Sequence, residues 1–210
     1  MSNSLALLGD SIFDNSAYTG GDPDVVTHLQ ALLPPDWAGS LLAIDGSVTA
    51  DLQAQLERVG DESHLIISVG GNDAIMNSDL LGLPVSSTAE ALLIFGERMS
   101  YFESAYRAAI DAALILRRQT TVCTIYNADL PAAEAPLARM GLMLFNDVIL
   151  RTAFERRLAV IDLRLVCTDP ADYANQIEPS GRGGRKIAEA IARSLGILDG
   201  TAGGSQVYAG

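Results

Sequence analysis

The sequence has little of three things that many functional sites need: histidine, cysteine and basic residues. Its 210 residues include two histidines, two cysteines, and 14 Lys or Arg against 26 Asp or Glu, which gives a net charge of −12. So few His and Cys, with no CxxC or HExxH pattern, disfavour a transition-metal site and a disulfide framework. The negative charge disfavours nucleic-acid binding, which needs Lys and Arg patches to replace counterions. We therefore expect no metal, no cofactor and no nucleic-acid partner.

Long apolar runs are also missing. No run reaches the roughly 18 residues that a membrane helix needs, so we expect no membrane span. The first residues, MSNSLALLGDS, contain neither a basic region nor a small-residue cleavage site after an apolar stretch. We therefore expect no signal peptide and a cytoplasmic protein. The sequence leaves the oligomeric state open.

Short apolar runs alternate with amphipathic helical stretches along the chain. Strands are expected within 4–11, 40–47, 64–73, 120–127 and 158–163, and helices within 22–33, 48–59, 88–118, 137–157 and 183–196. Strands without polar alternation, separated by helices, indicate a parallel sheet that is covered on both faces. The sequence therefore predicts a three-layer α/β/α sandwich with about five parallel strands, in one domain over 1–198. Residues 199–210 are predicted to be a flexible C-terminal tail.

Chemically useful residues follow the first three predicted strands. Ser11 follows the first strand in GDSI, Gly46 follows the second in DGS, and Asn72 follows the third in GGND. Ligands bind at the carboxyl ends of parallel strands, so the three residues meet if these strands are neighbours. Each alone has an ordinary role as a cap or a turn. Together they supply a serine nucleophile and three donors for an oxyanion: the N–H groups of Ser11 and Gly46 and the Asn72 side-chain amide.

This ordered set resembles the SGNH, or GDSL-type, hydrolase family, from about residue 5 to residue 196. Members are serine esterases, lipases and carbohydrate deacetylases with a flavodoxin-like fold. The resemblance implies that Ser11 is the nucleophile and that Gly46 and Asn72 complete the oxyanion hole. It also implies a small-molecule carboxylic ester as the substrate, with a short acyl or acetyl group.

The last block of the family pattern is altered in this chain. The family has an Asp, two residues and then a His just before the final helix, and this His accepts the serine proton. Aligning NQIEPSGRGGRKIA on that block places Asn175 at the Asp position and Glu178 at the His position. His64 starts the third predicted strand, at the end far from Ser11, and His28 lies well inside the first predicted helix. We expect neither histidine to reach Ser11.

Three interpretations of this change remain. In the first, Glu178 is the base, which requires burial to raise its ordinary pKa of about 4.3. In the second, the protein keeps the oxyanion hole and only binds acyl or acetylated ligands. In the third, another carboxylate approaches the serine: Asp10, Asp14, Asp73 or Asp169. We expect a serine hydrolase of low or specialised activity.

Glu178 and two segments of the chain also have other interpretations. Glu178 also suits a solvent-exposed loop near a helix start, where the helix dipole favours a carboxylate. The stretch SGRGGRKIA could instead place an anion at the start of a helix. Residues 74–88 would wall the pocket, and their apolar side chains suit either an acyl site or the core: Met76, Leu80, Leu81 and Leu83.

Overall fold

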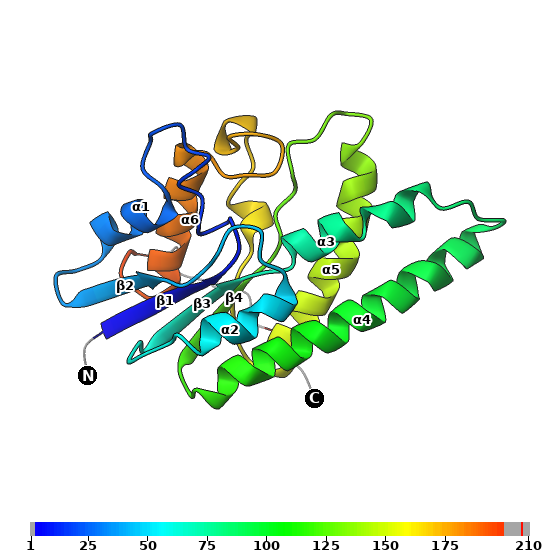
Figure 1. Ribbon diagram of the computed structural model, residues 1–210. Helices are drawn as coiled ribbons and strands as arrows, with labels where there is room; N and C mark the ends of the chain where they lie inside the picture. Colours follow the sequence, from blue (N-terminus) through cyan, green and yellow to red (C-terminus); the bar gives the residue numbers. More distant parts are fainter. Residues whose placement is uncertain (1–2, 200–206, 208–210) are drawn as a thin grey trace.

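The computed structural model describes residues 3–199 and residue 207 (Figure 1). Its five strands form one parallel sheet in the order β2-β1-β3-β4-β5. Their bounds are β1 Asn3–Gly9, β2 Trp37–Leu41, β3 His64–Ser68, β4 Gln119–Cys123 and β5 Ala159–Ile161. The predicted three-layer fold with about five parallel strands is confirmed. The predicted tail lies outside the described residues, except for 199 and 207.

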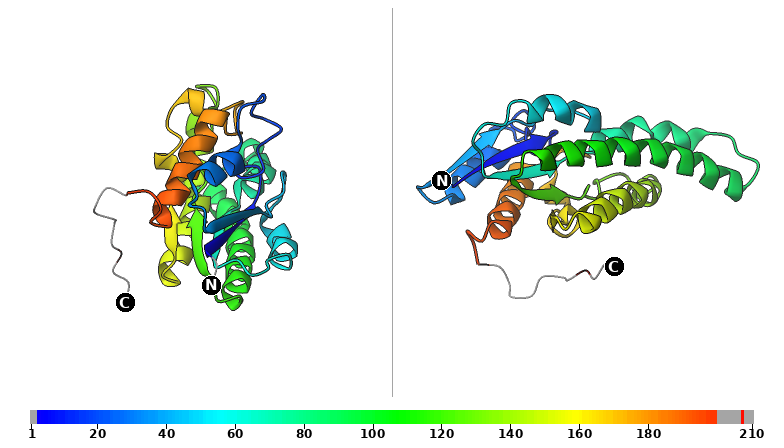
Figure 2. Two further views of the ribbon diagram at one scale, coloured as in Figure 1. Left: turned by 90° about the vertical axis from the view of Figure 1, so that its left-hand side faces the viewer. Right: turned by 90° about the horizontal axis from the view of Figure 1, so that it is seen from below.

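Helices cover both faces of the sheet, as the two views in Figure 2 show. On one face α1 packs against α6, and on the other α4 packs against α2 and α5. The helices are α1 Val25–Leu32, α2 Leu52–Leu56, α3 Gly71–Met76, α4 Thr88–Ile115, α5 Ala135–Glu155 and α6 Gly181–Ser194. Short 3-10 helices lie between them: η1 Thr49–Asp51, η2 Ser78–Gly82, η3 Leu163–Leu165 and η4 Pro170–Asp172.

Strand β1 shows why the sequence lacks polar alternation. Successive side chains of a strand point to opposite faces. Leu5 and Leu7 pack in the core on the α1 and α6 side, whereas Ala6 and Leu8 pack in the core under α2, α4 and α5. Because both faces are covered, both sets of side chains must be apolar.

Several element boundaries differ from the sequence prediction: α3 Gly71–Met76 begins inside the predicted third strand, and β2 and α1 are also shifted. Strand β2 spans Trp37–Leu41, not 40–47, and its residues are half-buried or exposed because it lies at the sheet edge. The chain beyond Leu41 still follows β1 for a few residues, since the N–H groups of Ala43 and Ile44 donate to Leu7 and Gly9 carbonyl oxygens at 2.8 and 3.1 Å. Helix α1 begins only at Val25, because the Asp24 carboxylate caps it.

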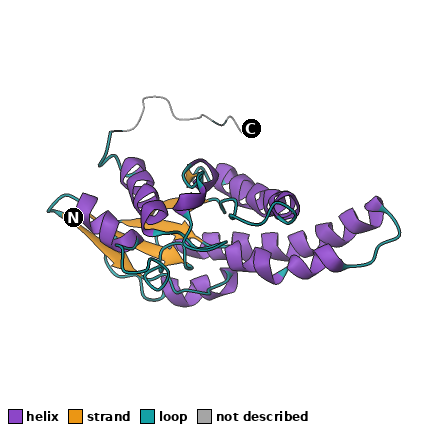
Figure 3. Cartoon of the chain, turned by 90° about the horizontal axis from the view of Figure 1, so that it is seen from above, coloured by secondary structure: helices purple, strands orange, loops and turns teal. Residues whose placement is uncertain are grey.

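One part of the fold reaches well beyond the sheet. Figures 1 and 3 show α3, η2 and the first half of α4 extending past the strands as a helical hairpin. Helix α4 has 28 residues and its second half returns to the core. Within the described part of the chain, no helix combines the length and apolar character needed to cross a membrane.

Candidate active site

The end of β1 places Ser11 at the carboxyl edge of the sheet. Gly9 has a φ of +128°, and a Cβ atom there would lie 1.7 Å from the Ser68 carbonyl oxygen. Only glycine allows so close an approach between β1 and β3. The next residue, Asp10, donates its N–H to the same oxygen at 3.2 Å. Ser11 follows in a turn and is only 7% exposed, on the wall of a cleft.

Gln55 of α2 joins the end of β1 to the loop that carries Gly46. Its side chain accepts the Gly9 N–H at 2.7 Å and donates to the Gly9 carbonyl oxygen at 2.8 Å. It also donates to the Ser47 hydroxyl at 3.2 Å. Gln55 is 1% exposed, so this buried amide has all its partners at one junction. Sequence analysis missed it, because a glutamine inside an amphipathic helix gives no signal.

The Gly46 loop is also joined to the start of α3. The Asn72 amide nitrogen donates to the Ser47 carbonyl oxygen at 2.9 Å. Next to it, the Asp73 carboxylate accepts the N–H and the hydroxyl of Thr49 at 2.9 and 3.0 Å. An amide nitrogen carries two hydrogens, so Asn72 retains a second donor for a substrate oxygen.

The three predicted oxyanion residues come from adjacent strands but not from one cavity. Ser11 and Asn72 both line the cleft, whereas Gly46 lines a neighbouring polar hollow with Asp45, Asp51 and Arg58. Gly46 adopts a φ of +79°, and a Cβ there would meet nothing within 4 Å. Its backbone is therefore open to a ligand that approaches from this side.

Glu178 lies in the loop between η4 and α6 and is 7% exposed. Burial raises the pKa of its carboxyl above the usual value, and the nearby Asp45 charge raises it further. The neighbouring Ser11 side chain acts in the opposite direction and lowers this pKa. The oxygen Glu178 Oε2 is buried and has no hydrogen-bond partner among the described residues. A buried carboxylate with a free acceptor beside a serine is suited to take its proton.

Asn175 contacts the backbone of this loop. Its side-chain oxygen accepts the N–H groups of Ile177 and Glu178 at 2.8 and 2.9 Å. The loop is closed by a further bond of 2.8 Å from the Ala174 N–H to the Glu178 carbonyl oxygen. The Asn175 side chain is exposed. Its hydrogen bonds order the backbone of the loop that carries Glu178.

Asp172, at the end of η4, stabilises the start of the same loop. Its buried carboxylate accepts Lys186 Nζ at 2.6 Å and the N–H groups of Thr168 and Asp169 at 3.0 Å each. Burial alone would raise the pKa of Asp172, but the lysine and the two N–H donors outweigh it and lower the pKa. A Cβ at Gly183 would lie 2.0 Å from the Asp172 carbonyl oxygen. The glycines of SGRGGRKIA thus include one that allows α6 to approach this loop.

Of the carboxylates considered from the sequence, Asp10 shares the cleft with Glu178, and Glu134 of the segment before α5 also lines it. It is 3% exposed, and burial raises its pKa to about 7, with smaller contributions from the charges of Glu178 and Asp73. The other three carboxylates considered from the sequence do not line the cleft. Asp14 accepts the Asp45 N–H, Asp73 binds Thr49, and Asp169 caps η4.

Both histidines make contacts elsewhere. His28 Nε2 lies 3.0 Å from the Gly181 carbonyl oxygen, and the His64 ring lies against Trp37 with centroids 5.2 Å apart. Cys123 and Cys167 are buried free thiols. Over residues 3–199 and 207, no group of three His, Cys, Asp or Glu side chains is placed to hold a metal ion.

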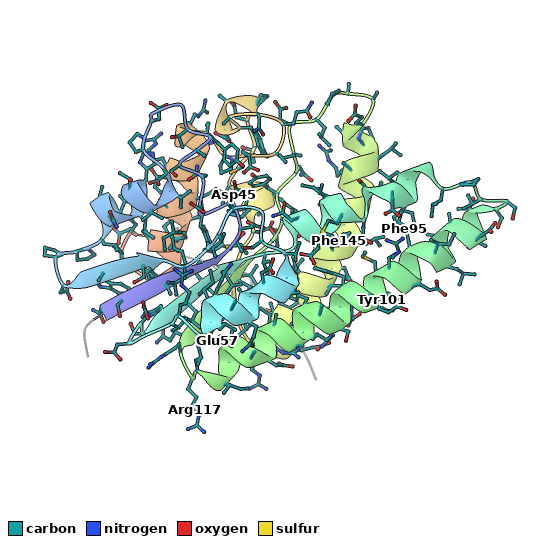
Figure 4. The ribbon with its side chains drawn as sticks, in the orientation of Figure 1. Asp45, Glu57, Phe95, Tyr101, Arg117 and Phe145 are labelled. Carbon is teal, nitrogen blue, oxygen red and sulfur yellow. The ribbon has the colours of Figure 1, made fainter. Side chains whose placement is uncertain are left out.

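The cleft beside Ser11 has a volume of about 320 Å³. Ser11, Asn72 and Glu178 lie on its wall, and the remaining wall comes mainly from apolar side chains of α3, η2, α4 and α5. Figure 4 labels two of these residues, Phe95 of α4 and Phe145 of α5. The arrangement places a serine hydroxyl, a buried carboxylate and an apolar space on one cleft.

Comparisons with known proteins agree with the fold described above and match one family. The sequence profile of the GDSL-like lipase/acylhydrolase family matches residues 7–186. No protein of curated function is similar enough in sequence to count as a match.

Solved structures share the fold at low sequence identity. A lipase from a goat rumen metagenome has a TM-score of 0.72 and 19% identity, covering 93% of this chain and 98% of that one. A member of the lipolytic protein G-D-S-L family from Veillonella parvula has a TM-score of 0.70 and 17% identity, covering 93% and 99%. A catalytic mutant of an acetylxylan esterase from Geobacillus stearothermophilus has a TM-score of 0.69 and 19% identity, covering 95% and 97%.

Proposed function

The chain belongs to the GDSL-like lipase/acylhydrolase family, and we propose that it is a serine esterase in which Glu178 replaces the usual histidine. Its substrate is a small-molecule carboxylic ester. Ser11 is the nucleophile, and the Ser11 N–H and the Asn72 amide bind the oxyanion from the cleft. The Gly46 N–H is the third proposed donor and approaches from the neighbouring hollow. The observation that carries the proposal is the buried Glu178 carboxylate on the wall of the cleft that also holds Ser11.

In the first half of the proposed reaction, Glu178 accepts the Ser11 proton while Ser11 Oγ attacks the ester carbonyl carbon. The carbonyl oxygen becomes an oxyanion and takes the three donors. When the tetrahedral intermediate collapses, the bond to the alcohol oxygen breaks and the alcohol leaves with the proton from Glu178. An acyl group then remains on Ser11.

In the second half, Glu178 takes a proton from water, and the water oxygen attacks the acyl carbon. Collapse returns the proton to Ser11 Oγ and releases the carboxylic acid. A positioned base typically contributes about 10²–10⁴-fold in rate. Glu178 is a weaker base than histidine, but burial raises its pKa, so we expect a slow enzyme.

The proposal is tested by hydrolysis of p-nitrophenyl acetate and butyrate by the wild type, Ser11→Ala and Glu178→Gln. Ser11→Ala should abolish turnover, and Glu178→Gln should lower kcat/KM by about 10²-fold or more. Equal rates for the wild type and Ser11→Ala would contradict the proposal that the protein is a serine esterase. Circular dichroism shows whether each variant is folded.

The second candidate is a family member that binds acyl or acetylated ligands without turnover. It is favoured by one observation, that neither histidine contacts Ser11. A serine-directed phosphonate followed by intact mass measurement separates the two candidates. Labelling of wild type but not Ser11→Ala supports the esterase, whereas no labelling with saturable binding of an acetylated ligand supports the binding protein.

A further inference from the structure

The cleft beside Ser11 is larger than an acetyl group requires. We propose that it binds the acyl chain of a medium-chain ester, and that the absence of a side chain at Gly141 keeps it open. This inference rests on the proposed hydrolase function and assigns the substrate class of the same site. It goes beyond the short acyl group that the sequence favours.

The chemistry of the wall changes along the cleft. Polar groups of Asp10, Ser11, Asn72 and Glu178 gather where the ester would react. The cleft, with its volume of about 320 Å³, is otherwise mainly apolar, and its larger aliphatic and aromatic side chains include Ile75, Leu80, Phe95, Leu137, Leu142 and Phe145. An acetyl group has one methyl group beyond its carbonyl, so it would leave most of this wall in contact with water. A longer aliphatic chain would cover it, and covering apolar surface is the main source of binding free energy in such pockets.

The two helices that form the walls are fixed to each other outside the cleft. In their second halves, α4 and α5 are joined by ion pairs of Arg107 with Glu155 and of Arg151 with Glu103. The rings of Phe102 and Phe145 contact each other at an interplanar angle of 56°, with centroids 4.6 Å apart. These contacts fix the distance between the first halves of α4 and α5. The gap between the two helices is therefore maintained by the fold itself.

Gly141 lies inside α5 and lines this gap. A Cβ there would meet nothing within 4 Å, and Gly141 is not among the glycines with positive φ. Glycine is unfavourable inside a helix because its backbone loses the most freedom on folding. Neither the backbone conformation nor close packing therefore explains a glycine at position 141, whereas the need to keep the cleft open does.

Apolar residues at the mouth of the cleft are unusually exposed. Ile75, Leu81 and Leu137 line it and are 48%, 50% and 56% exposed. They are not part of either core cluster. An acyl chain that enters between α3, η2 and α5 would cover these side chains.

The experiment measures kcat/KM on p-nitrophenyl acetate, butyrate, hexanoate, octanoate and decanoate for the wild type, Gly141→Leu and Gly96→Leu. Gly96 is the matched control, because it lies inside α4, a Cβ there also meets nothing within 4 Å, and it does not line the cleft. For the wild type, kcat/KM should rise about three- to fourfold per buried methylene up to a maximum at medium length. Gly141→Leu should lower the ratio of the octanoate value to the acetate value by about tenfold or more. Gly96→Leu should follow the wild type.

Several outcomes overturn the inference. Preference of the wild type for acetate over octanoate would do so, as would an unchanged length profile in Gly141→Leu. A series of alkyl acetates with lengthening alcohols is run alongside, and length dependence confined to that series would place the alcohol in the cleft and refute the acyl assignment. These results leave Ser11-dependent hydrolysis intact, so they differ from a failure of the proposed function, in which Ser11→Ala equals the wild type.

Binding gives a readout that does not depend on turnover. Calorimetry with octanoate should show saturable binding to Ser11→Ala, and the double variant Ser11→Ala with Gly141→Leu should bind about tenfold more weakly or worse. Equal affinity of the two proteins would refute the role of Gly141. Thermal unfolding provides the folding control, since leucine favours the helix more than glycine does.

Discussion

The side-chain oxygen of Asn175 accepts the backbone N–H of Glu178 at 2.9 Å. Asn175 therefore orders the backbone of the loop that carries Glu178, whose buried carboxylate lies on the same cleft as Ser11. Asn and Asp side chains both accept N–H groups two and three residues ahead, as in Asx turns. The loop thus depends on an acceptor at position 175, whether or not that acceptor is charged.

The first prediction concerns this acceptor. Asn175→Asp should keep kcat/KM within about threefold of the wild type, since it retains both N–H partners. Asn175→Ala leaves two N–H groups without their acceptor, each hydrogen bond contributing about 1 kcal/mol, and should lower kcat/KM by about tenfold. The measurement is p-nitrophenyl butyrate hydrolysis with a thermal melt for each variant. Equal losses in the two variants would contradict a role in ordering the loop.

The second prediction concerns the pH dependence of the rate. Hydrolysis requires the ionised form of Glu178, whose pKa burial raises above its ordinary value of 4.5. The rate should therefore be low in acid and rise with pH through an ionisation above that value. Asp10 next to it ionises near pH 7, so the profile reports apparent values for the pair of carboxyls. A flat profile for the wild type, or the same rise in Glu178→Gln, would contradict Glu178 as the base.

The third prediction concerns stability and Asp10. Its pKa is about 7 in the folded protein against an ordinary 3.8, so the folded state holds a proton that the unfolded chain releases between these values. This contribution to stability is complete below the lower value and is lost as the pH rises through the higher one. Relative to Asp10→Asn, the wild type should lose on the order of 4 kcal/mol of unfolding free energy over that range. Urea unfolding at a series of pH values measures it, and parallel curves would refute the buried, protonated Asp10.

The fourth prediction concerns the anchor below the Glu178 loop. Asp172→Ala leaves Lys186 and two backbone N–H groups without their acceptor, and should destabilise the protein by about 3–5 kcal/mol. The control is Asp147→Ala, which removes an exposed pair with Arg151 and should cost less than about 1 kcal/mol. Both are measured by urea unfolding. A similar small loss in the two variants would show that Asp172 contributes no more than a surface carboxylate.

The order of strands and helices could be predicted because each element carries its own periodic pattern. The patterns also placed Ser11 and Asn72 near one edge, since residues that follow parallel strands share that edge. Prediction failed at β2, where the edge position gives half-exposed residues over Trp37–Leu41 and no continuous apolar run. It also missed Gln55 and Asp172, which are buried polar residues whose partners are distant in the chain or lie in irregular loops.

The sequence by itself determined the α/β/α fold, the GDSI and GGND positions and the family, because these depend on local patterns and short ordered motifs. It also pointed to Asn175 and Glu178 in the segment before the last helix. Only the tertiary structure decided that Glu178 is buried, on the cleft that also holds Ser11, rather than exposed in a loop. It alone showed that segments about 60 residues and more from Ser11 form an apolar cleft beside it, with Gly141 on its wall. Burial and cavity shape arise from packing between distant segments, which no local pattern records.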